Sequence, residues 1–210
     1  MSTSGYAGDF LREVAEVSTA IKVLYSEKLD QAIDLLFEAW KEGRWVYIMG
    51  NGGSASTATH LAADLAKTIC EKPEDHGLKT MALVDNIPLV SALTNDWGWD
   101  RVYENQLSTY YVPGGVGIGL SVHGGNGKDI AGQWSQNLLR GLQYIKDRGG
   151  KTIGLSGFDG GPMKTLVDIG IVVPANSTPM VEGIHVVLNH LLVFGLKEKI
   201  HAFKAASYFS

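Results

Sequence analysis

Short apolar runs alternate with segments of helical length and period through most of this chain of 210 residues. After residue 44, the runs occupy residues 45–48, 80–84, 117–122, 151–155 and 169–173. Alternation of this kind indicates βαβ units and a parallel sheet that helices cover on both faces. The sequence therefore predicts an α/β fold, a three-layer αβα sandwich with a five-stranded parallel sheet.

Two further segments of helical periodicity, residues 9–25 and 26–42, precede the first apolar run. In the second segment apolar residues recur at helical spacing from Leu29 to Trp40, Ser26 is a candidate N-cap and Gly43 ends the pattern. No repeat or long linker interrupts the chain. We expect a pair of N-terminal helices over 1–43 that serves packing or oligomerisation, an αβα core over 44–210, and a single domain over 1–210.

Charge, cysteine content and hydropathy exclude several classes of protein. The net charge is −4 and no block of Lys or Arg occurs, which argues against a nucleic-acid surface. The single cysteine, Cys70, excludes an intrachain disulfide and favours a reducing compartment. Residues 1–9 lack the basic start and apolar run of a signal peptide. The apolar region 180–200 carries charged residues that a membrane span would hold only at high cost, so we expect a buried helix of a soluble, cytoplasmic protein without a membrane partner.

The run Gly50-Asn51-Gly52-Gly53-Ser54 joins the first predicted strand to a segment with helical period, residues 55–69. A strand that leads through glycines and a capping serine into a helix presents free N–H groups at a positive helix end, which suits an anion such as phosphate. The spacing Gly50-x-Gly52-x-x-Ala55 also fits a relaxed dinucleotide fingerprint, with Asp85 as its acidic residue. A tight turn without a ligand is the third interpretation.

Glycine-rich loops follow two more of the predicted strands, at residues 123–127 and 157–161. The first precedes a segment of helical period, residues 130–148, and adds the side chains of His123, Asn126 and Lys128. Parallel αβα sandwiches bind ligands at the carboxyl ends of their strands, so three such loops at one edge indicate a ligand site. The alternative for 123–127 is a flexible turn with Asp129 as a helix cap.

His60 and Asp64 stand four residues apart on the predicted helix 55–69, so they share a face. Histidine and carboxylate at this spacing suit zinc or an acid/base pair. The last predicted helix adds Glu182, His185 and His190, and the sequence leaves open which of the two histidines functions.

Glu182 and His190 lie eight residues apart, which on an ideal helix is about 80° of rotation and roughly 12 Å of rise. One metal ion cannot take both from the same straight helix. Either Glu182 precedes the regular helix, or the site is shared between subunits. Polar core residues with partners are the alternative interpretation of this set.

In their order along the chain, these motifs resemble the sugar isomerase (SIS) domain of the phosphoheptose isomerase family. The shared motifs are Gly-Asn-Gly-Gly-Ser at 50–54, His60 with an acidic residue at 64, Thr94-Asn95-Asp96-Trp97-Gly98, residues 155–161, and Glu182-x-x-His185 followed by His190. The resemblance covers almost the whole chain and implies an SIS domain. Members of the family convert sedoheptulose 7-phosphate to heptose 7-phosphate, generally as tetramers with active sites at subunit interfaces, often with zinc.

The resemblance also implies roles for individual residues. Zinc, or another divalent metal, would be held by His60, Asp64, Glu182 and His190, and Asp64 and His190 would double as the acid/base pair. The residues that would contact the substrate are Asn51, Gly52, Gly53, Ser54, Asp64, Asn95, Asp96, Val122, His123, Gly124, Asn126, Gly127 and Glu182. Within this set the main anion site lies in the loop 123–127.

The sequence departs from the family pattern at four places. Asp64 stands where the family usually has Glu, Glu182 where it has Gln, and Pro179 where it has an acidic residue. The phosphate loop, serine-rich in the family, here reads His-Gly-Gly-Asn-Gly at 123–127. We expect an aldose–ketose isomerase acting on sedoheptulose 7-phosphate as a homotetramer. The alternatives are an isomerase of another phosphosugar, a non-catalytic SIS protein that binds a phosphosugar or a replication initiator, and a dinucleotide-dependent oxidoreductase.

Overall fold

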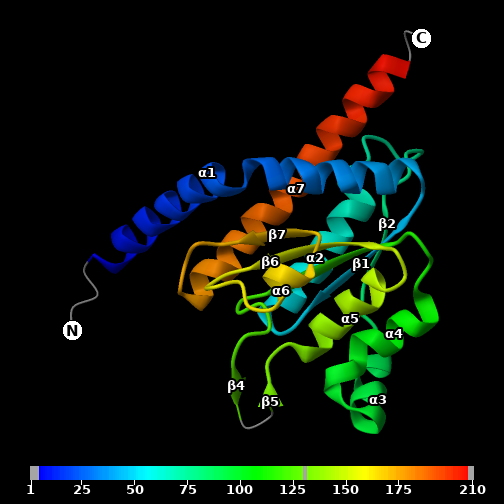
Figure 1. Cartoon of the computed structure of the whole chain (residues 1–210). Coiled ribbons are helices and arrows are strands. Elements are labelled where there is room, and N and C mark those ends of the chain that lie inside the picture. Colours follow the sequence, from blue (N-terminus) through cyan, green and yellow to red (C-terminus); the bar gives the residue numbers. More distant parts are fainter. Residues whose placement is uncertain (1–4, 130–131, 208–210) are drawn as a thin grey trace.

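Five parallel strands form the central sheet in a computed structural model that describes residues 5–129 and 132–207 (Figure 1). The strands are β1 (Trp45–Gly50), β2 (Lys79–Ala82), β3 (Val116–Ser121), β6 (Lys151–Ser156) and β7 (Ile169–Val172). Their order in the sheet is β2-β1-β3-β6-β7, and each neighbouring pair is parallel. The five-stranded parallel sheet predicted from the sequence is confirmed.

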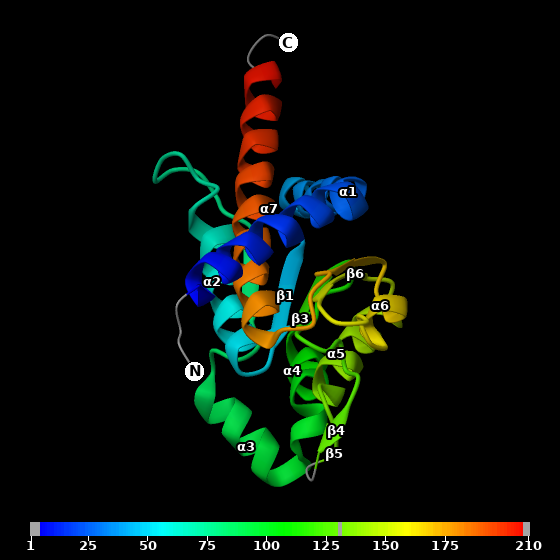
Figure 2. The same cartoon turned by 90° about the vertical axis from the view of Figure 1, so that its left-hand side faces the viewer.

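Helices cover both faces of this sheet, and each face has its own apolar core (Figure 2). On one face pack α1 (Tyr6–Lys41), α2 (Gly53–Lys67) and α7 (Thr178–Ser207). The other face carries α3 (Ile87–Trp97), the 3₁₀ turn η1 (Trp99–Arg101), α4 (Val102–Tyr110), α5 (Gln136–Lys146) and α6 (Met163–Leu166). Because successive side chains of a strand point to opposite faces, Val46 and Ile48 join the first core and Tyr47 and Met49 the second.

The N-terminal segment forms one continuous helix, α1, so the prediction of a pair of helices is wrong. Ser26 does not cap a second helix, because its hydroxyl donates to the carbonyl of Lys22 one turn earlier and leaves the helix unbroken. The buried face of α1 includes Ile21, Leu29 and Leu36 and packs against α7 and β7. The helix is therefore an integral part of one core.

The helix predicted over 130–148 begins later, at Gln136. A short antiparallel hairpin, β4 (Lys128–Asp129) and β5 (Gly132–Gln133), precedes it, and Ile130 and Ala131 lie outside the described residues. The backbone of Gly132 has a φ of 102°, which a helix does not allow. Asp129 therefore belongs to β4 and is not a helix cap, and Ser135 occupies the N-cap position of α5.

The apolar C-terminal region forms the single long helix α7. Its segment Thr178–Ala206 is the only helix within 5–129 and 132–207 that is long and apolar enough to cross a membrane, and half of its most apolar window is buried inside the protein. The buried side chains, which include Val181, Leu188 and Leu196, lie in the core with α1 and α2. The expected packing of this helix against the core is thus present.

Candidate functional site

The loop after β1 turns sharply into α2, as the glycine run predicts. A Cβ atom at Gly50 would overlap the carbonyl of Ser54, and Gly52 adopts a φ of 56°, so both positions need glycine. The helix begins at Gly53 and ends at Lys67, two residues earlier at each end than predicted. The loop lies at the carboxyl edge of the sheet, where ligands bind in folds of this type.

Asn51 fixes this loop to α5 with both ends of its amide. Its Nδ2 donates to Asn137 Oδ1 at 3.0 Å, and Asn137 Nδ2 donates back to Asn51 Oδ1 at 2.8 Å. The hydroxyl of Tyr103 donates to the carbonyl of Gly50 and lies 3.2 Å from Asn51 Oδ1. Burial raises the pKa of Tyr103, so its hydroxyl keeps the proton that it donates. No sequence signal pointed to Tyr103 or Asn137, because their role depends on contacts between distant segments.

His60, Asp64 and His190 come together where α7 packs against α2. His60 Nε2 lies 3.2 Å and His190 Nε2 3.7 Å from Asp64 Oδ2, and the two imidazole rings are 5.0 Å apart. Asp64 is the most buried of the three, and its Oδ1 accepts a 2.8 Å hydrogen bond from Thr68 Oγ1. The structure thus unites three of the four predicted metal ligands, among them both predicted catalytic residues.

The donor atoms of this cluster suit a zinc ion. A tetrahedral zinc with bonds of about 2.1 Å places neighbouring ligand atoms about 3.4 Å apart. The two observed separations from Asp64 Oδ2, 3.2 and 3.7 Å, bracket that value, and all three donor atoms lie within 4.8 Å of one another. Thr68 orients the carboxylate from behind, as outer partners of metal ligands usually do. The three residues therefore fit a divalent metal that prefers nitrogen and oxygen ligands.

Glu182, the fourth predicted ligand, does not join this cluster within one chain. The helix α7 begins at Thr178, so Glu182 does not precede its regular part. Its carboxylate packs against Gly53 at the start of α2, where a Cβ atom would overlap it. The structure therefore excludes the explanation that Glu182 precedes the regular helix, and a site shared between subunits is the explanation that is left.

Glu182 lines a separate cavity of about 150 Å³ at the carboxyl edge of the sheet. The cavity is lined by Asn51, Ser54, Leu120, Ser121, Val122, His123, Trp134, Ser135 and Glu182. Five residues predicted to contact the substrate therefore meet here, from the loops after β1 and β3 and from α7. Trp134 and Ser135 were missed, because the hairpin before α5 was not expected.

Three other predicted substrate residues face away from this cavity or pack into the protein. Gly124 lies against the carbonyl of Gly160, which a Cβ atom would overlap. Asn126 donates from Nδ2 to Asp159 Oδ2 at 2.7 Å. Gly127 lies beneath the indole ring of Trp134. The glycines of this loop thus permit close packing.

Asn95 and Asp96 lie on the exposed surface of α3. Their side chains bond to each other, with Asn95 Nδ2 donating to Asp96 Oδ1 at 2.8 Å. Neither residue lines the 150 Å³ cavity or belongs to the cluster around Asp64. Within one chain, this motif is not brought to the other predicted site residues.

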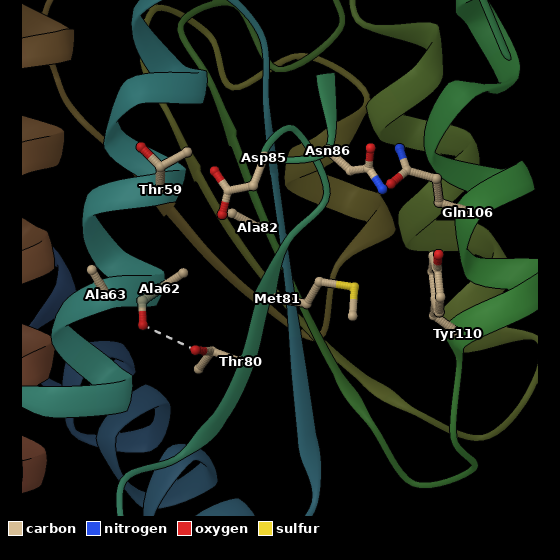
Figure 3. A pocket seen from close by; sticks show the side chains of 10 residues that line it. All are labelled: Thr59, Ala62, Ala63, Thr80, Met81, Ala82, Asp85, Asn86, Gln106 and Tyr110. Carbon is tan, nitrogen blue, oxygen red and sulfur yellow. Dashed lines mark hydrogen bonds between the residues drawn. The ribbon is translucent and has the colours of Figure 1, made fainter. Parts of the chain in front are cut away.

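A further cavity of about 440 Å³ lies between α2 and α4 beside β2 (Figure 3). Thr59, Ala62 and Ala63 form one wall, and Gln106 and Tyr110 stand opposite (Figure 3). Asp85 lines this cavity and not the one beside the loop 50–54. Asp85, the acidic residue of the dinucleotide interpretation, therefore does not share a cavity with the glycine loop 50–54.

His185 is fully buried, and neither of its ring nitrogens has a hydrogen-bond partner in the described part of the chain. Burial lowers its pKa to about 4, so the ring is neutral at pH 7. His190, not His185, faces Asp64. The structure therefore separates an accessible histidine, available for chemistry, from a core histidine one turn earlier on α7.

Comparison with known proteins supports the architecture and the motifs. The sequence model of the SIS domain matches residues 9–157. The phosphoheptose isomerase of Aliarcobacter butzleri is 35% identical over 184 residues, which are 88% of this chain and 91% of that protein. The lincomycin biosynthesis protein LmbN of Streptomyces lincolnensis is 38% identical over 173 residues, 80% of this chain and 62% of that protein. The structure of phosphoheptose isomerase GmhA from Neisseria gonorrhoeae superposes with a TM-score of 0.82 at 23% identity, covering 94% of this chain and all of that one.

The buried imidazole of His185 makes the fold sensitive to acid. An imidazole in an unfolded chain titrates near ~6.5, so between about pH 6.5 and 4 the unfolded chain binds more protons than the folded protein and stability falls with pH. From pH 7 to pH 5 we expect the wild type to lose about 2 kcal/mol more free energy of unfolding than His185→Leu. Urea titrations at both pH values measure the difference. His201→Gln, which changes an exposed histidine, should behave like the wild type. Equal acid losses in wild type and His185→Leu would contradict the assignment.

Proposed function

The chain belongs to the phosphoheptose isomerase family of SIS domain proteins, and we propose that it converts sedoheptulose 7-phosphate to D-glycero-D-manno-heptose 7-phosphate. It is thus an aldose–ketose isomerase. The observation that carries the proposal is the carboxylate of Asp64 set between the imidazoles of His60 and His190 on a partly exposed surface. Substrate binding alone does not need this trio of one carboxylate and two imidazoles.

The reaction moves one proton between neighbouring carbons and one between their oxygens. Asp64 takes the proton from C1, beside the carbonyl, and the electron pair of that C–H bond forms the C1–C2 double bond of an enediolate. His190 gives a proton to O2 and accepts one from O1, and Asp64 returns its proton to C2. The two groups are close enough to face one substrate, with 3.7 Å between Asp64 Oδ2 and His190 Nε2.

Zinc is the metal that we assign to the cluster, held by His60, Asp64 and His190 with Glu182 as the fourth ligand. Nitrogen and carboxylate donors at the observed separations support this choice. When bound, a divalent metal polarises the carbonyl and hydroxyl oxygens of the substrate. The second carboxylate, in place of a neutral amide, favours retention of the metal.

We infer that the active sites lie at interfaces of a homotetramer, the assembly that the family resemblance implied. Glu182 of one chain is absent from the cluster of the same chain, so another copy must supply it if it is a ligand. Exposed apolar side chains surround His190 on α7 at the spacing i, i+4, i+7: Val187 is 53%, Leu191 40% and Phe194 50% exposed. A second copy packed on this stripe would bring the ligand sets together.

Two further proposals concern the domain organisation and the cellular location of the protein. We propose that residues 1–210 act as one domain, since α1 shares a core with α7. We place the protein in the cytoplasm, which agrees with its single unpaired cysteine.

A second candidate function, isomerisation of another phosphosugar, is favoured by the loop 123–127, which lacks serine. A panel of ketose phosphates assayed for aldose formation separates the two substrates.

The acid/base assignment predicts loss of turnover without loss of fold. Asp64→Asn and His190→Gln should each lower kcat about 10²–10⁴-fold, because each removes a group that moves a proton. Conversion of sedoheptulose 7-phosphate measures the effect, and circular dichroism checks the fold. Asp30→Asn and His201→Gln change exposed residues of the same types and should keep wild-type activity. Near-normal turnover in either site variant would overturn the assignment.

The metal assignment predicts zinc in the purified protein. We expect about one equivalent per chain, and Thr68→Val should weaken zinc binding about 10–100-fold, because Asp64 loses the hydrogen bond that orients it. Metal analysis by mass spectrometry and competition with a chelator measure both quantities. Thr19→Val, which removes an exposed threonine hydroxyl on α1, is the control. Unchanged zinc affinity in Thr68→Val would contradict the role given to this carboxylate.

A shared site predicts complementation between inactive variants. When Glu182→Ala and His190→Gln chains are mixed and reassembled, some sites combine an intact Glu182 with an intact His190, and activity should recover to about one quarter of wild type. A mixture of His60→Ala and His190→Gln should stay inactive, because those two residues act in the same chain. Recovery in neither mixture would contradict a site that is shared between chains.

A further inference from the structure

The cavity of about 440 Å³ between α2 and α4, beside the edge strand β2, has no part in the proposed function (Figure 3). None of its lining residues belongs to the cluster around Asp64 or lines the 150 Å³ cavity. Small-molecule sites in proteins have volumes of about 300–1,000 Å³, so this cavity is large enough for a ligand. The side chains that face it decide which ligand it suits.

Gln106 is the buried polar group of this cavity, with a residue exposure of 3%. Its Nε2 donates to the carbonyl of Leu83 at 2.8 Å and to that of Val102 at 3.3 Å. Both hydrogens of the amide are thereby used, so the amide is held in one orientation and Oε1 is left to accept. This oxygen has no partner within residues 5–129 and 132–207, and the amide end points into the cavity (Figure 3).

Two threonines add further acceptors. Thr80 Oγ1 donates to the carbonyl of Ala62 at 2.9 Å, and Thr59 Oγ1 donates at 2.9 Å to a carbonyl one turn earlier on α2. Each hydroxyl has used its one hydrogen, so its oxygen is left to accept. Asn86 is the opposite case, because its Oδ1 accepts from the backbone N–H of Leu89 at 3.1 Å and its Nδ2 is left to donate.

Asp85 is the only charged residue among those that line the cavity. Its carboxylate makes no hydrogen bond or ion pair within the described part of the chain. In Figure 3 it lies on the opposite side of the cavity from Gln106. A phosphate or carboxylate ligand would meet this negative charge with no Lys, Arg or His beside it. The lining therefore disfavours anions and favours a ligand that donates hydrogen bonds and carries a positive charge.

The remaining walls are apolar, which excludes a bare metal ion as the natural occupant. Hard cations in proteins take six or more oxygen ligands in a compact shell, whereas carbon atoms cover much of this cavity. The ring of Tyr110, which is 40% exposed, adds an aromatic face that attracts organic cations. The other apolar residues are Ala62, Ala63, Met81 and Ala82.

We propose that this cavity binds a small organic cation, a primary amine on a compact carbon skeleton. The ammonium group pairs with Asp85, its hydrogens reach Gln106 Oε1 and the threonine oxygens, and the carbon skeleton packs on Tyr110 and Met81. Amino sugars and short polyamines share this chemistry. The site is separate from the catalytic cluster, so the proposal does not rest on the isomerase function.

The test compares each amine with its uncharged counterpart by calorimetric titration of the full chain at physiological ionic strength. Glucosamine is paired with glucose, and putrescine with the diol of the same chain length. At least one amine should bind ten-fold or more tightly than its counterpart, because only the ammonium pairs with the carboxylate. Binding of glucosamine alone identifies an amino-sugar site, and binding of putrescine alone identifies a polyamine site.

Variants locate the binding in this cavity. Asp85→Asn should weaken amine binding about 10- to 100-fold, because the charge-assisted hydrogen bond is lost. Tyr110→Ala should weaken it about 3- to 10-fold, whereas Tyr110→Phe keeps the ring and should retain most of the affinity. Asp30→Asn removes an exposed carboxylate on α1 and should bind like the wild type.

The outcomes separate this site from the proposed function. Asp85→Asn should convert sedoheptulose 7-phosphate as the wild type does, because Asp85 lies outside the catalytic cluster. If neither amine binds more tightly than its counterpart, the cavity is not an amine site. Equal amine affinity in Asp85→Asn and wild type likewise overturns the proposal, whether or not the protein is an active isomerase.

Discussion

The packing of α7 against α2 is the contact on which the candidate active site depends. α2 carries His60 and Asp64, α7 carries His190, and neither helix holds the set alone. Next to His190, the buried amide of Asn189 donates to the carbonyl of Thr57 at 3.0 Å. A slip of either helix would leave that donor unpaired in the core, so this bond favours one register between the helices. By favouring this register, the buried hydrogen bond between Asn189 and Thr57 helps to set the distance between Asp64 on α2 and His190 on α7.

The order of the strands explains where the 150 Å³ cavity forms. β1 lies between β2 and β3, and the helices that follow β1 and β3, α2 and α5, pack on opposite faces of the sheet. Where neighbouring strands send their connections to opposite sides, a crevice opens at their carboxyl ends. The residues that line the cavity come from the ends of these two strands, from the N-termini of the two helices and from α7.

Strong local patterns in the sequence predicted the sheet, α2 and α7, because buried strands and amphipathic helices carry their period within a few residues. His60 and Asp64 followed from helical spacing, and His190 from a family resemblance. The single helix α1 was missed because Ser26 reads as a cap in isolation, while in the helix it bonds backwards to Lys22. The two-residue strands β4 and β5 are too short to leave a period. Tyr103, Asn137 and Ser135 gain their roles only when α4 and α5 meet the loops of the sheet, which no local pattern encodes.

The reciprocal amide pair between Asn51 and Asn137 also bears on the thermodynamics of binding. With the hydroxyl of Tyr103, this pair locks the glycine loop before any ligand arrives. Glycine-rich segments lose more conformational entropy on ordering than other sequences do. Here that entropy is lost when the protein folds and not when the sugar phosphate associates, so a larger part of the contact free energy remains as affinity. A loop whose composition suggests flexibility thereby acts as a preorganised surface.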